Sequence, residues 1–359
     1  MYMGALPVIV PPIMNDLTNN SKLTLEDVGR MAGVSRSTVS RVMNNHPYVS
    51  EDVRKRVQET VKSTGYHTNA AARALVTQRS WTLGVVLPRT VHSFFTDPYF
   101  PRLIQGIAQA CNQLNYTLGL FLISSKEDEE KIFPRISRRG SLDGILFQSD
   151  QIGDQLIERL ARSNVPMVII GRPFHDDNIN YINNDNINSA FMAVDHLIKL
   201  GYKRIGTITG PSNTTVGIDR KEGYVKALKN EGRLIDESLI AEGDFTEAGG
   251  YKQMQKLLAA KPDAIFSASD LMAIGAMRAV REAGLSIPGD IAFIGFDDLP
   301  LSTPVDPPLS TVHQSVLEFG FKAVEFLIDL IEDGTKPSRH IIMDTELIIR
   351  KSCGAYQRK

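Results

Sequence analysis

Residues 23–45, LTLEDVGRMAGVSRSTVSRVMNN, decide the fold of the N-terminal part of the chain. Thr24 stands three residues before Asp27, which is close to the spacing of a capping box at a helix start. Apolar residues then recur at helical spacing: Leu25, Val28 and Met31. This segment therefore predicts a short helix with one buried face.

A second short helix is predicted directly after the first. Gly33 interrupts the apolar pattern with a residue that tolerates positive φ and lets the chain turn sharply. Ser35 is a suitable N-cap for the next helix, whose buried positions would be Val39 and Val42. Two short helices joined by a glycine-containing turn predict a helix-turn-helix.

The outer face of the second helix carries small or polar side chains that fit a DNA major groove. Arginine can bind guanine through two hydrogen bonds, and asparagine can bind adenine in the same way. The alternative is an ordinary surface helix with solvated charges. The residues of this face are Arg36, Ser37, Ser40, Arg41 and Asn44.

A third helix over residues 51–64 is predicted to close the core of this head. Ser50 is its expected cap, and the apolar residues at helical spacing are Val53, Val57 and Val61. The basic residues 54–56 would contact phosphate groups or face solvent.

The following segment, HTNAAARALVTQRS (residues 67–80), is a candidate hinge. Asn69 can cap a short alanine-rich helix, and Leu75 near its end could wedge between base steps in the minor groove. A plain linker helix is the alternative. So short a helix should form only against a partner.

The charges of the chain are unevenly distributed. Residues 22–80 hold ten Lys/Arg and five Asp/Glu, a net charge of +5, which leaves −6 for the remainder and −1 in total. A basic head joined to an acidic body indicates that only the head meets a polyanion.

From Trp81 onward, near-continuous apolar strands alternate with amphipathic helices. This repeat predicts parallel sheets covered by helices on both faces, and the length of the segment indicates two similar lobes. Ligands of such folds bind at the carboxyl ends of the strands. Aromatic and charged side chains follow those ends and suit a sugar. The effector-binding candidates are Tyr99, Phe100, Arg172, Arg220, Ser269 and Asp297. Asp185 and Asp270 are expected to cap helices.

The order of these parts resembles the LacI family of bacterial regulators. The resemblance rests on GVSRSTVSRVMN, the third helix ending in GY, NAAARAL and the strand WTLGVVLP, and it extends from Leu23 to Lys351. Within the family the likeness to maltose-operon repressors rests on DPYFPRLIQGIAQACNQ, YINNDNINSA and DTELIIRKS.

The resemblance implies a helix-turn-helix head on a periplasmic-binding-protein-like body of two doubly wound parallel-sheet lobes. It also implies a homodimer that represses a sugar-utilisation operon from a pseudo-palindromic operator, with maltose or a maltodextrin as the inducer. Control by a different sugar, or by a corepressor, is the alternative. The expected parts are a disordered tail (1–21), the DNA-binding domain (22–67), the hinge (68–80) and the effector-binding and dimerisation domain (81–359). Three crossings would give an N-lobe of 82–182 plus 309–337 and a C-lobe of 183–308 plus 338–350.

The resemblance assigns base reading to Arg36, Ser37 and Arg41, and minor-groove insertion to Leu75. The full set of DNA-contacting candidates is Ser35, Arg36, Ser37, Thr38, Ser40, Arg41, Asn44, Asn69, Arg73 and Leu75. The sequence departs from the family at two of its motifs. Thr68 replaces the usual proline before the hinge, and Ser269 replaces the asparagine of the lactose-type pattern, which leaves glucosides open.

Other functional classes find little support in the sequence. It has no phosphate loop, no Gly-x-Ser-x-Gly elbow and no HExxH motif, so neither an enzyme nor a cofactor is expected. Cys111 and Cys353 have no metal-ligand spacing, and no apolar run is long enough for a membrane. A sugar-binding receptor would suit the body but not the head. A cytoplasmic regulator is therefore expected.

Overall fold

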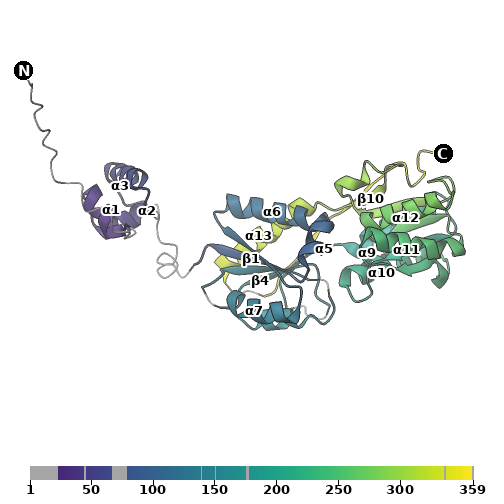
Figure 1. Cartoon of the computed structure of the whole chain (residues 1–359), viewed down its shortest axis with the longest axis horizontal. Coiled ribbons are helices and arrows are strands. Elements are labelled where there is room, and N and C mark those ends of the chain that lie inside the picture. Colours follow the sequence, from purple (N-terminus) through teal and green to yellow (C-terminus); the bar gives the residue numbers. More distant parts are fainter. Residues whose placement is uncertain are drawn as a thin grey trace, which may run out of the picture. The chain divides into compact units, whose positions relative to one another are not determined.

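The computed structural model describes residues 23–43, 46–66, 79–138, 140–149, 151–174, 178–334 and 337–357. The chain divides into two compact units, the head (Met1–Gln78) and the body (Arg79–Lys359) (Figure 1).

The described part of the head is a three-helix unit with an apolar centre. Its helices are α1 (Leu25–Ala32), α2 (Arg36–Met43) and α3 (Glu51–Thr64). Val28, Val39, Val42 and Val57 are buried together, and Val53 and Val61 pack against them. The buried positions predicted for α2 and α3 are therefore confirmed.

The turn between α1 and α2 has the predicted geometry. Thr24 and Asp27 form both hydrogen bonds of a capping box, and Gly33 adopts a φ of 64°. The Ser35 hydroxyl accepts a hydrogen bond from the Thr38 amide at 3.2 Å, as expected of an N-cap. Ser50 occupies the N-cap position of α3 as predicted, although its side chain makes no capping hydrogen bond.

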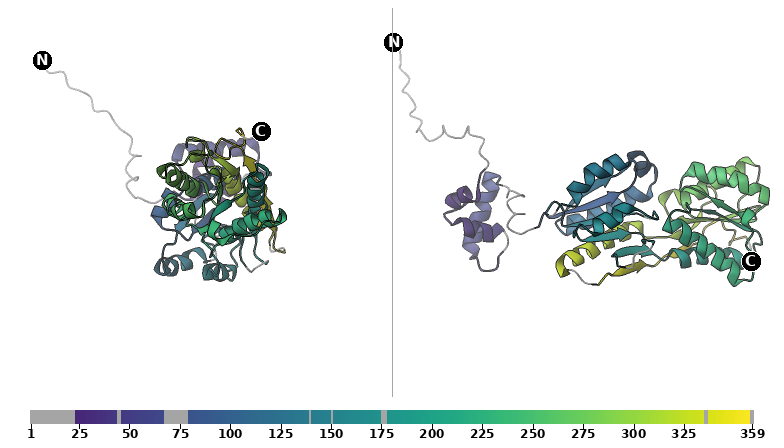
Figure 2. Two further views of the ribbon diagram at one scale, coloured as in Figure 1. Left: turned by 90° about the vertical axis from the view of Figure 1, so that its right-hand side faces the viewer. Right: turned by 90° about the horizontal axis from the view of Figure 1, so that it is seen from below.

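The body consists of two α/β lobes, each with a six-stranded sheet between helices (Figures 1 and 2). The first lobe has strand order β11-β5-β4-β3-β1-β2, and all its strands are parallel. Its strands are β1 (Thr82–Leu87), β2 (Thr117–Leu122), β3 (Gly144–Gln148), β4 (Met167–Ile170), β5 (Tyr181–Asn184) and β11 (His340–Met343). Its helices are α5 (Val91–Thr96), α6 (Tyr99–Gln113), α7 (Lys126–Ile136), α8 (Gln155–Ala161) and α13 (Val316–Asp333).

The second lobe repeats this design with strand order β12-β10-β9-β8-β6-β7. The edge strand β12 is antiparallel to β10, and the other pairs are parallel. Its strands are β6 (Ile205–Thr209), β7 (Ile240–Glu242), β8 (Ala264–Ser267), β9 (Ala292–Asp297), β10 (Ser310–His313) and β12 (Glu346–Ile348). Its helices are α9 (Asn186–Lys199), α10 (Thr215–Asn230), α11 (Glu247–Leu257) and α12 (Asp270–Glu282), with short 3-10 turns at Glu237–Leu239, Leu258–Ala260 and Pro300–Ser302. The predicted fold class is confirmed.

The chain passes between the lobes later than the sequence predicted. Strand β10 lies in the second lobe, although the first was expected to begin again at residue 309. Strand β11 pairs with β5 in the first lobe, although residue 338 was expected to begin the return to the second. Figure 2 shows the late segment that contains α13 (yellow) lying with the first lobe. The crossings follow β5, β10 and β11, because each strand completes its ladder before the chain leaves its sheet.

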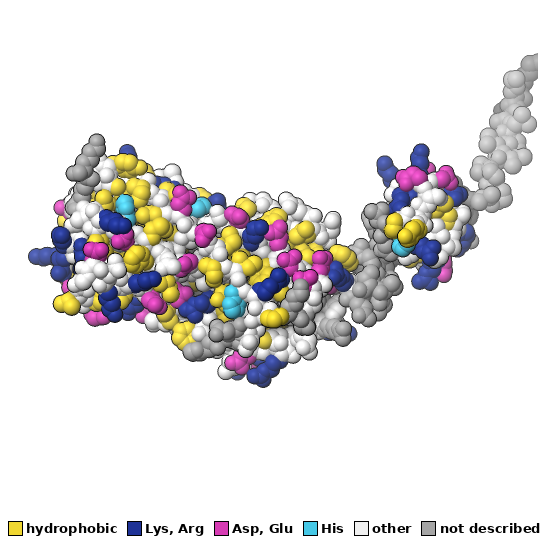
Figure 3. All heavy atoms as spheres, turned by 180° about the vertical axis from the view of Figure 1, so that it is seen from behind, with side chains coloured by type: hydrophobic (Ala, Val, Ile, Leu, Met, Phe, Trp, Pro, Cys, Tyr) yellow, Lys and Arg dark blue, Asp and Glu magenta, His cyan; other side chains and the backbone are white. Residues whose placement is uncertain are grey.

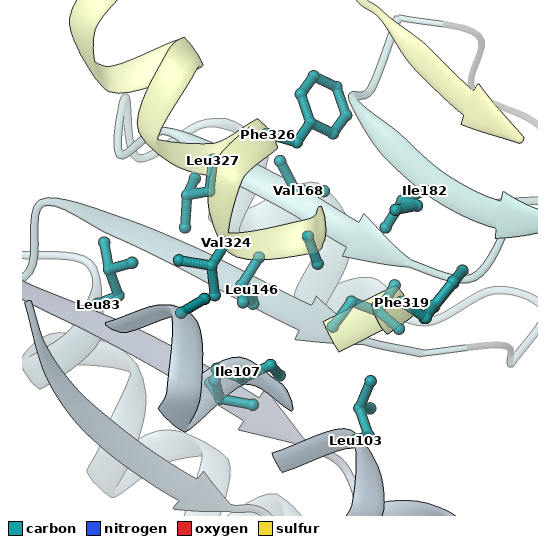
Figure 4. Close-up of a cluster of buried hydrophobic side chains, with 14 of the residues drawn as sticks. Leu83, Leu103, Ile107, Leu146, Val168, Ile182, Phe319, Val324, Phe326 and Leu327 are labelled. Atoms are coloured by element: carbon teal, nitrogen blue, oxygen red, sulfur yellow. The ribbon is translucent and has the colours of Figure 1, made fainter. Parts of the chain in front are cut away.

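The core of the first lobe forms on both faces of its sheet. Leu83, Val85 and Leu87 of β1 pack toward α6 and α13, whereas Val86 packs toward α7 and α8. This alternation is the expected consequence of the strand geometry. Figure 4 shows side chains of α6, α13 and the central strands meeting in the first of these cores.

Helices α6 and α13 approach each other through two glycines. A Cβ on Gly106 would lie 1.9 Å from the Leu317 carbonyl oxygen, and one on Gly320 would lie 2.4 Å from that of Leu103. Backbone atoms cannot yield as a flexible side chain would. The close packing of this helix pair therefore depends on both glycines.

None of the described helices is long and apolar enough to span a membrane.

We expect Gly106→Ala to destabilise the body by about 1–3 kcal/mol, because the added methyl group forces α6 away from α13. Urea unfolding of the full chain measures the change. Gln105→Ala, at the exposed neighbouring position on α6, is the matched control and should stay within about 0.5 kcal/mol of the wild type. Equal stability of the Gly106 variant and the control would contradict the close-packing argument.

Candidate functional site

The exposed residues at the start of α2 form the candidate DNA surface of the head. Ser35, Arg36, Ser37 and Arg41 are exposed, and Thr38 and Ser40 are half-buried. The other DNA-contacting candidates, Asn44, Asn69, Arg73 and Leu75, lie outside the described residues. The structure thus places six of the ten candidates on one short helix and the residue that caps it.

The N-terminus of α2 is held by a local hydroxyl cluster. The Ser35 hydroxyl lies 2.8 Å from those of Ser37 and Thr38. Arg36 is 3.6 Å from Glu26 of α1, but both side chains are about two-thirds exposed. An exposed ion pair of this kind contributes little stability. The Arg36 guanidinium can therefore exchange Glu26 for another partner at small cost.

Charge on the body is mixed. Figure 3 shows Lys/Arg and Asp/Glu side chains interspersed over one face of the body. This face lacks the single-sign field that steers a protein to DNA, whereas the head as a whole is basic.

The body contains a cavity at the carboxyl ends of strands from both lobes. Ligands of parallel α/β folds bind at this edge of the sheets. The lining combines amides, charged groups and aromatic rings. Its residues are Arg89, Asp97, Tyr99, Phe100, Gln148, Ile170, Gly171, Asn183, Asn184, Asn186, Val216, Arg220, Phe245, Ser269, Leu271, Asp297, Gln314 and Phe319.

Arg220 of α10 is the most extensively bound side chain of this cavity. Its guanidinium donates to Asn186 Oδ1 at 2.9 Å and to the Ala268 carbonyl at 2.6 Å. It also lies 3.4 Å from Asp297 Oδ1 and 3.5 Å above the Phe296 ring. These partners fix a buried cation in one orientation in the lining of the cavity.

Asp297 sits at the end of β9 in a backbone conformation that few residues adopt. Its φ is 113°, and the φ of Asp298 is 51°. Each such backbone conformation costs of order 1–3 kcal/mol and persists only where the surrounding structure holds it. Conformations of this kind cluster at functional sites. Burial raises the pKa of Asp297 to about 7, although Arg220 opposes the shift. Gln314 Nε2 donates to Asp297 Oδ1 at 2.5 Å, and Asn184 donates in turn to Gln314.

Asp270 is a buried carboxyl group that holds the turn following Asp297. It accepts hydrogen bonds from the Leu299 amide at 2.9 Å and the Thr311 hydroxyl at 2.6 Å, which hold the turn after Asp297. Burial, reinforced by the charge of Asp297, raises the pKa of Asp270. The cap predicted at Asp270 is wrong, because the hydroxyl of Ser269 caps α12. The cap predicted at Asp185 is confirmed by its bond to the Asn188 amide.

Five of the six effector-binding candidates line the cavity, and Arg172 does not. Arg172 follows β4 of the first lobe and donates to Asp219 of α10 at 2.5 and 3.2 Å. Its carbonyl accepts a hydrogen bond from Thr215 in the second lobe at 2.9 Å. Arg172 thus connects the two lobes beside the cavity. It does not line the cavity because its side chain is directed to Asp219, a partner that the sequence did not reveal.

The sequence argument missed Gln148, Asn184, Asn186 and Gln314. All four lie at or just after strand ends, and this position could have identified them in the same way as Asp297. The amides at 183, 184 and 186 and at 314 flank two of the crossings between the lobes. Whether these amides line the cavity depends on where the chain crosses between the lobes. The predicted crossings were misplaced, so the amides were not identified as lining residues.

Among the described residues no group of three or more His, Cys, Asp or Glu side chains could hold a metal ion.

Family models match both units of the chain. Residues 24–69 match the model of bacterial regulatory proteins of the lacI family, and residues 194–353 match a periplasmic binding protein-like domain. The chain is 34% identical over 333 residues to the HTH-type transcriptional regulator CelR of Thermobifida fusca, covering 92% of this chain and 98% of that protein. It is also 34% identical over 337 residues to the HTH-type transcriptional repressor PurR of Haemophilus influenzae, with the same coverage of both chains.

Solved structures show the same similarity. A complex of the transcriptional regulator CelR with cellobiose matches with a TM-score of 0.73 and 33% identity, covering 92% of this chain and 99% of that one. The Lac repressor dimer bound to operator and the anti-inducer ONPF matches with a TM-score of 0.80 and 26% identity, covering 93% and 99%.

The raised pKa of Asp297 predicts a specific pH dependence of stability. The folded carboxyl keeps its proton up to about pH 7, whereas the unfolded carboxyl loses it near about pH 4. This stabilising contribution is therefore complete below about pH 4 and lost as the pH rises to about 7. We expect the free energy of unfolding of the wild type to fall over this range relative to Asp297→Asn, measured by urea unfolding.

Asp298→Asn provides a control of opposite sign. Burial raises the pKa of Asp298, but the hydrogen bond and charge of Arg350 outweigh it and lower the pKa overall. The advantage of the wild type over this variant should therefore be lost as the pH falls. Parallel pH curves for the wild type and Asp297→Asn would refute the assignment.

Proposed function

Because the chain belongs to the LacI family of bacterial regulatory proteins, we propose that it represses a sugar-utilisation operon under control of a small sugar. The family makes it a DNA-binding transcriptional regulator with a ligand-binding body, not an enzyme. The observation that carries the sugar proposal is the cavity, where aromatic rings stand beside amides and charged groups. Aromatic faces suit the CH patches of a sugar ring, and polar side chains suit its hydroxyls.

In this proposal the start of α2 reads bases in the major groove. Arg36, Ser37 and Arg41 are exposed on that helix and contact base edges, while nearby hydroxyls contact phosphate groups. Asn69, Arg73 and Leu75 of the hinge contact the minor groove. Two heads of a homodimer then bind the two halves of a pseudo-palindromic operator.

The sugar in this proposal is a glucoside, with maltose or a maltodextrin as one candidate class. The similarity to a regulator solved with cellobiose supports a glucose disaccharide and adds the β-linked isomer as a second candidate. Tyr99 of the first lobe would pack against a ring face, with the buried Phe100 in contact with it. Arg220, Ser269 and Asp297 of the second lobe would bind hydroxyls. In this proposal the protein acts in the cytoplasm, where operator and sugar meet.

In this proposal the ligand controls operator binding through the three crossings of the chain between the lobes. The cavity is lined by both lobes, so a ligand that binds one lobe angle better shifts the protein toward that angle. A coupling of about 1–3 kcal/mol changes operator affinity by roughly 5–150-fold. We propose that the sugar favours an angle that separates the heads, and so acts as an inducer.

The experiment that tests this function is operator binding by fluorescence anisotropy, with a site selected from random DNA. Maltose, maltodextrins and cellobiose are titrated into the complex. Release of DNA by one of these sugars supports the proposal. Tight operator binding that is indifferent to all of them keeps the regulator and discards the glucoside.

We expect Arg41→Ala to weaken operator binding by about 1–3 kcal/mol and to relax preference at one base position, because a bidentate guanine contact is lost. Anisotropy on single-base variants of the selected site measures both effects. Arg162→Ala, which removes an exposed arginine of the body, is the matched control. An unchanged base preference in the Arg41 variant would remove this residue from base reading.

We expect Asp297→Asn to weaken sugar binding by about 2–10-fold, because a hydrogen bond between neutral groups contributes about 0.5–1.5 kcal/mol. Operator affinity without sugar should stay near that of the wild type. Asp329→Asn, at an exposed position of α13, serves as the control. A normal sugar response in the Asp297 variant would move the effector site elsewhere.

A further inference from the structure

The chain enters the body through a junction formed by Arg79, Ser80 and Trp81, directly after the head. Residues 67–78 lie outside the described residues, so the junction is where the description of the body begins. Asp143, the residue before β3, accepts hydrogen bonds from the Ser80 amide at 2.5 Å, the Ser80 hydroxyl at 2.7 Å and the Trp81 amide at 2.9 Å. One carboxylate thus holds two successive residues of the junction.

Trp81 is further held by the first lobe. Its φ is 53°, which a bulky residue rarely adopts. Its ring lies 5.3 Å from that of Tyr116, and its carbonyl accepts a hydrogen bond from the Thr117 amide at 2.8 Å. Such a conformation persists only where the surrounding structure holds it. The junction is therefore a fixed part of the first lobe and not a free linker.

The last turns of α13 contact this region at two points. Glu332 lies 3.8 Å from Nη1 of Arg79 in the junction. Leu327 packs on Gly144, the residue after Asp143, where a Cβ would lie 2.9 Å from Leu327 Cδ1. The absence of a side chain at Gly144 therefore lets α13 pack closely beside the carboxylate that holds the junction.

The opposite end of α13 lies at the cavity. The helix begins two residues after Gln314, which donates to Asp297, and Phe319 in its first turn lines the cavity. Its 18 residues span about 27 Å. Gly106 and Gly320 bring it into close contact with α6, so helix and lobe form one rigid unit. A rotation of the first lobe about the cavity therefore displaces the junction.

We propose that Asp143 is a positioning residue for the control of operator binding. By holding the junction rigid with α13, it passes a rotation of the first lobe to the hinge, whereas a flexible connection would absorb that rotation. Asp143 does not line the cavity, so it acts without touching the ligand. The inference rests on the proposed function, because it concerns how sugar binding reaches the head.

The test measures coupling, defined as the ratio of the operator dissociation constants with and without saturating sugar. Fluorescence anisotropy of the full chain gives this ratio, with whichever of maltose, maltotriose and cellobiose the wild type binds. We expect Asp143→Asn to lower the ratio about 2–30-fold, because it keeps the shape of the side chain but removes the charge and one acceptor. Sugar affinity by isothermal titration calorimetry, and operator affinity without sugar, should stay near the wild type.

Asp128→Asn is the matched control. Asp128 accepts hydrogen bonds from the amide and hydroxyl of Ser124 in the same lobe, as Asp143 does from those of Ser80. Ser124 follows the carboxyl end of β2, whereas the junction precedes the amino end of β1, so the two sites lie at opposite edges of the sheet. A role in stability alone would leave coupling unchanged in both variants.

Glu332→Gln tests the contact of α13 with the junction and decides the question if Asp143→Asn does not fold. Its ion pair with Arg79 is partly exposed, so the expected loss of coupling is smaller, about 1.5–5-fold. Glu325→Gln removes an ion pair with Lys322 on the same helix, with the same change of charge, and should keep the coupling of the wild type.

Wild-type coupling in a folded Asp143→Asn variant would overturn the inference, as would an equal loss of coupling in Asp128→Asn. If only the α13 variants fold, equal coupling in Glu332→Gln and Glu325→Gln would overturn it. By linkage, operator must change sugar affinity by the same ratio in each protein, which checks every value. A wild type whose operator affinity none of the sugars changes contradicts the proposed function and this inference with it.

Discussion

The buried pair of Arg220 and Asp297 is the interaction on which the ligand-binding body depends. A buried charge without a partner is strongly destabilising, so both side chains must be held by further hydrogen bonds. Asn186 and the Ala268 carbonyl hold Arg220, and Gln314 holds Asp297. Gln314 in turn accepts a hydrogen bond from Asn184 of the first lobe. The network therefore runs from α10 to the strand ends of both lobes.

This network lies where the chain itself passes between the lobes. Asn184 ends β5 just before one crossing, and Gln314 follows β10 at the next. A change in lobe angle must therefore alter side chains that also line the cavity. This shared position gives a physical basis for coupling between occupation of the cavity and lobe arrangement, because both act on the same hydrogen bonds. The ion pair of Arg172 with Asp219 adds a second tie between the lobes outside the cavity.

The backbone at Asp297 is also held in an unusual conformation by hydrogen bonds from its neighbours. Asp297 and Asp298 adopt positive φ, and Asp270 holds the turn that follows them. A Cβ on Gly295 would lie 2.3 Å from Asp270 Oδ1, so only glycine leaves room for this support. The conformational cost at Asp297 is therefore met by hydrogen bonds from a neighbouring strand and helix.

The sequence by itself determined the parts of this protein whose signals are local. Capping at Thr24, the turn at Gly33 and the buried valines of the head depend on residues a few positions apart. Alternating strands and helices likewise predicted two α/β lobes, and strand ends predicted five lining residues of the cavity. Only the tertiary structure decided the rest. It gave β10 and β11 to the opposite lobes from those expected, since a strand's sheet is chosen by distant pairing partners. It turned Arg172 toward Asp219 and placed Gln314 between Asn184 and Asp297, because hydrogen bonds between segments far apart in sequence carry no local pattern.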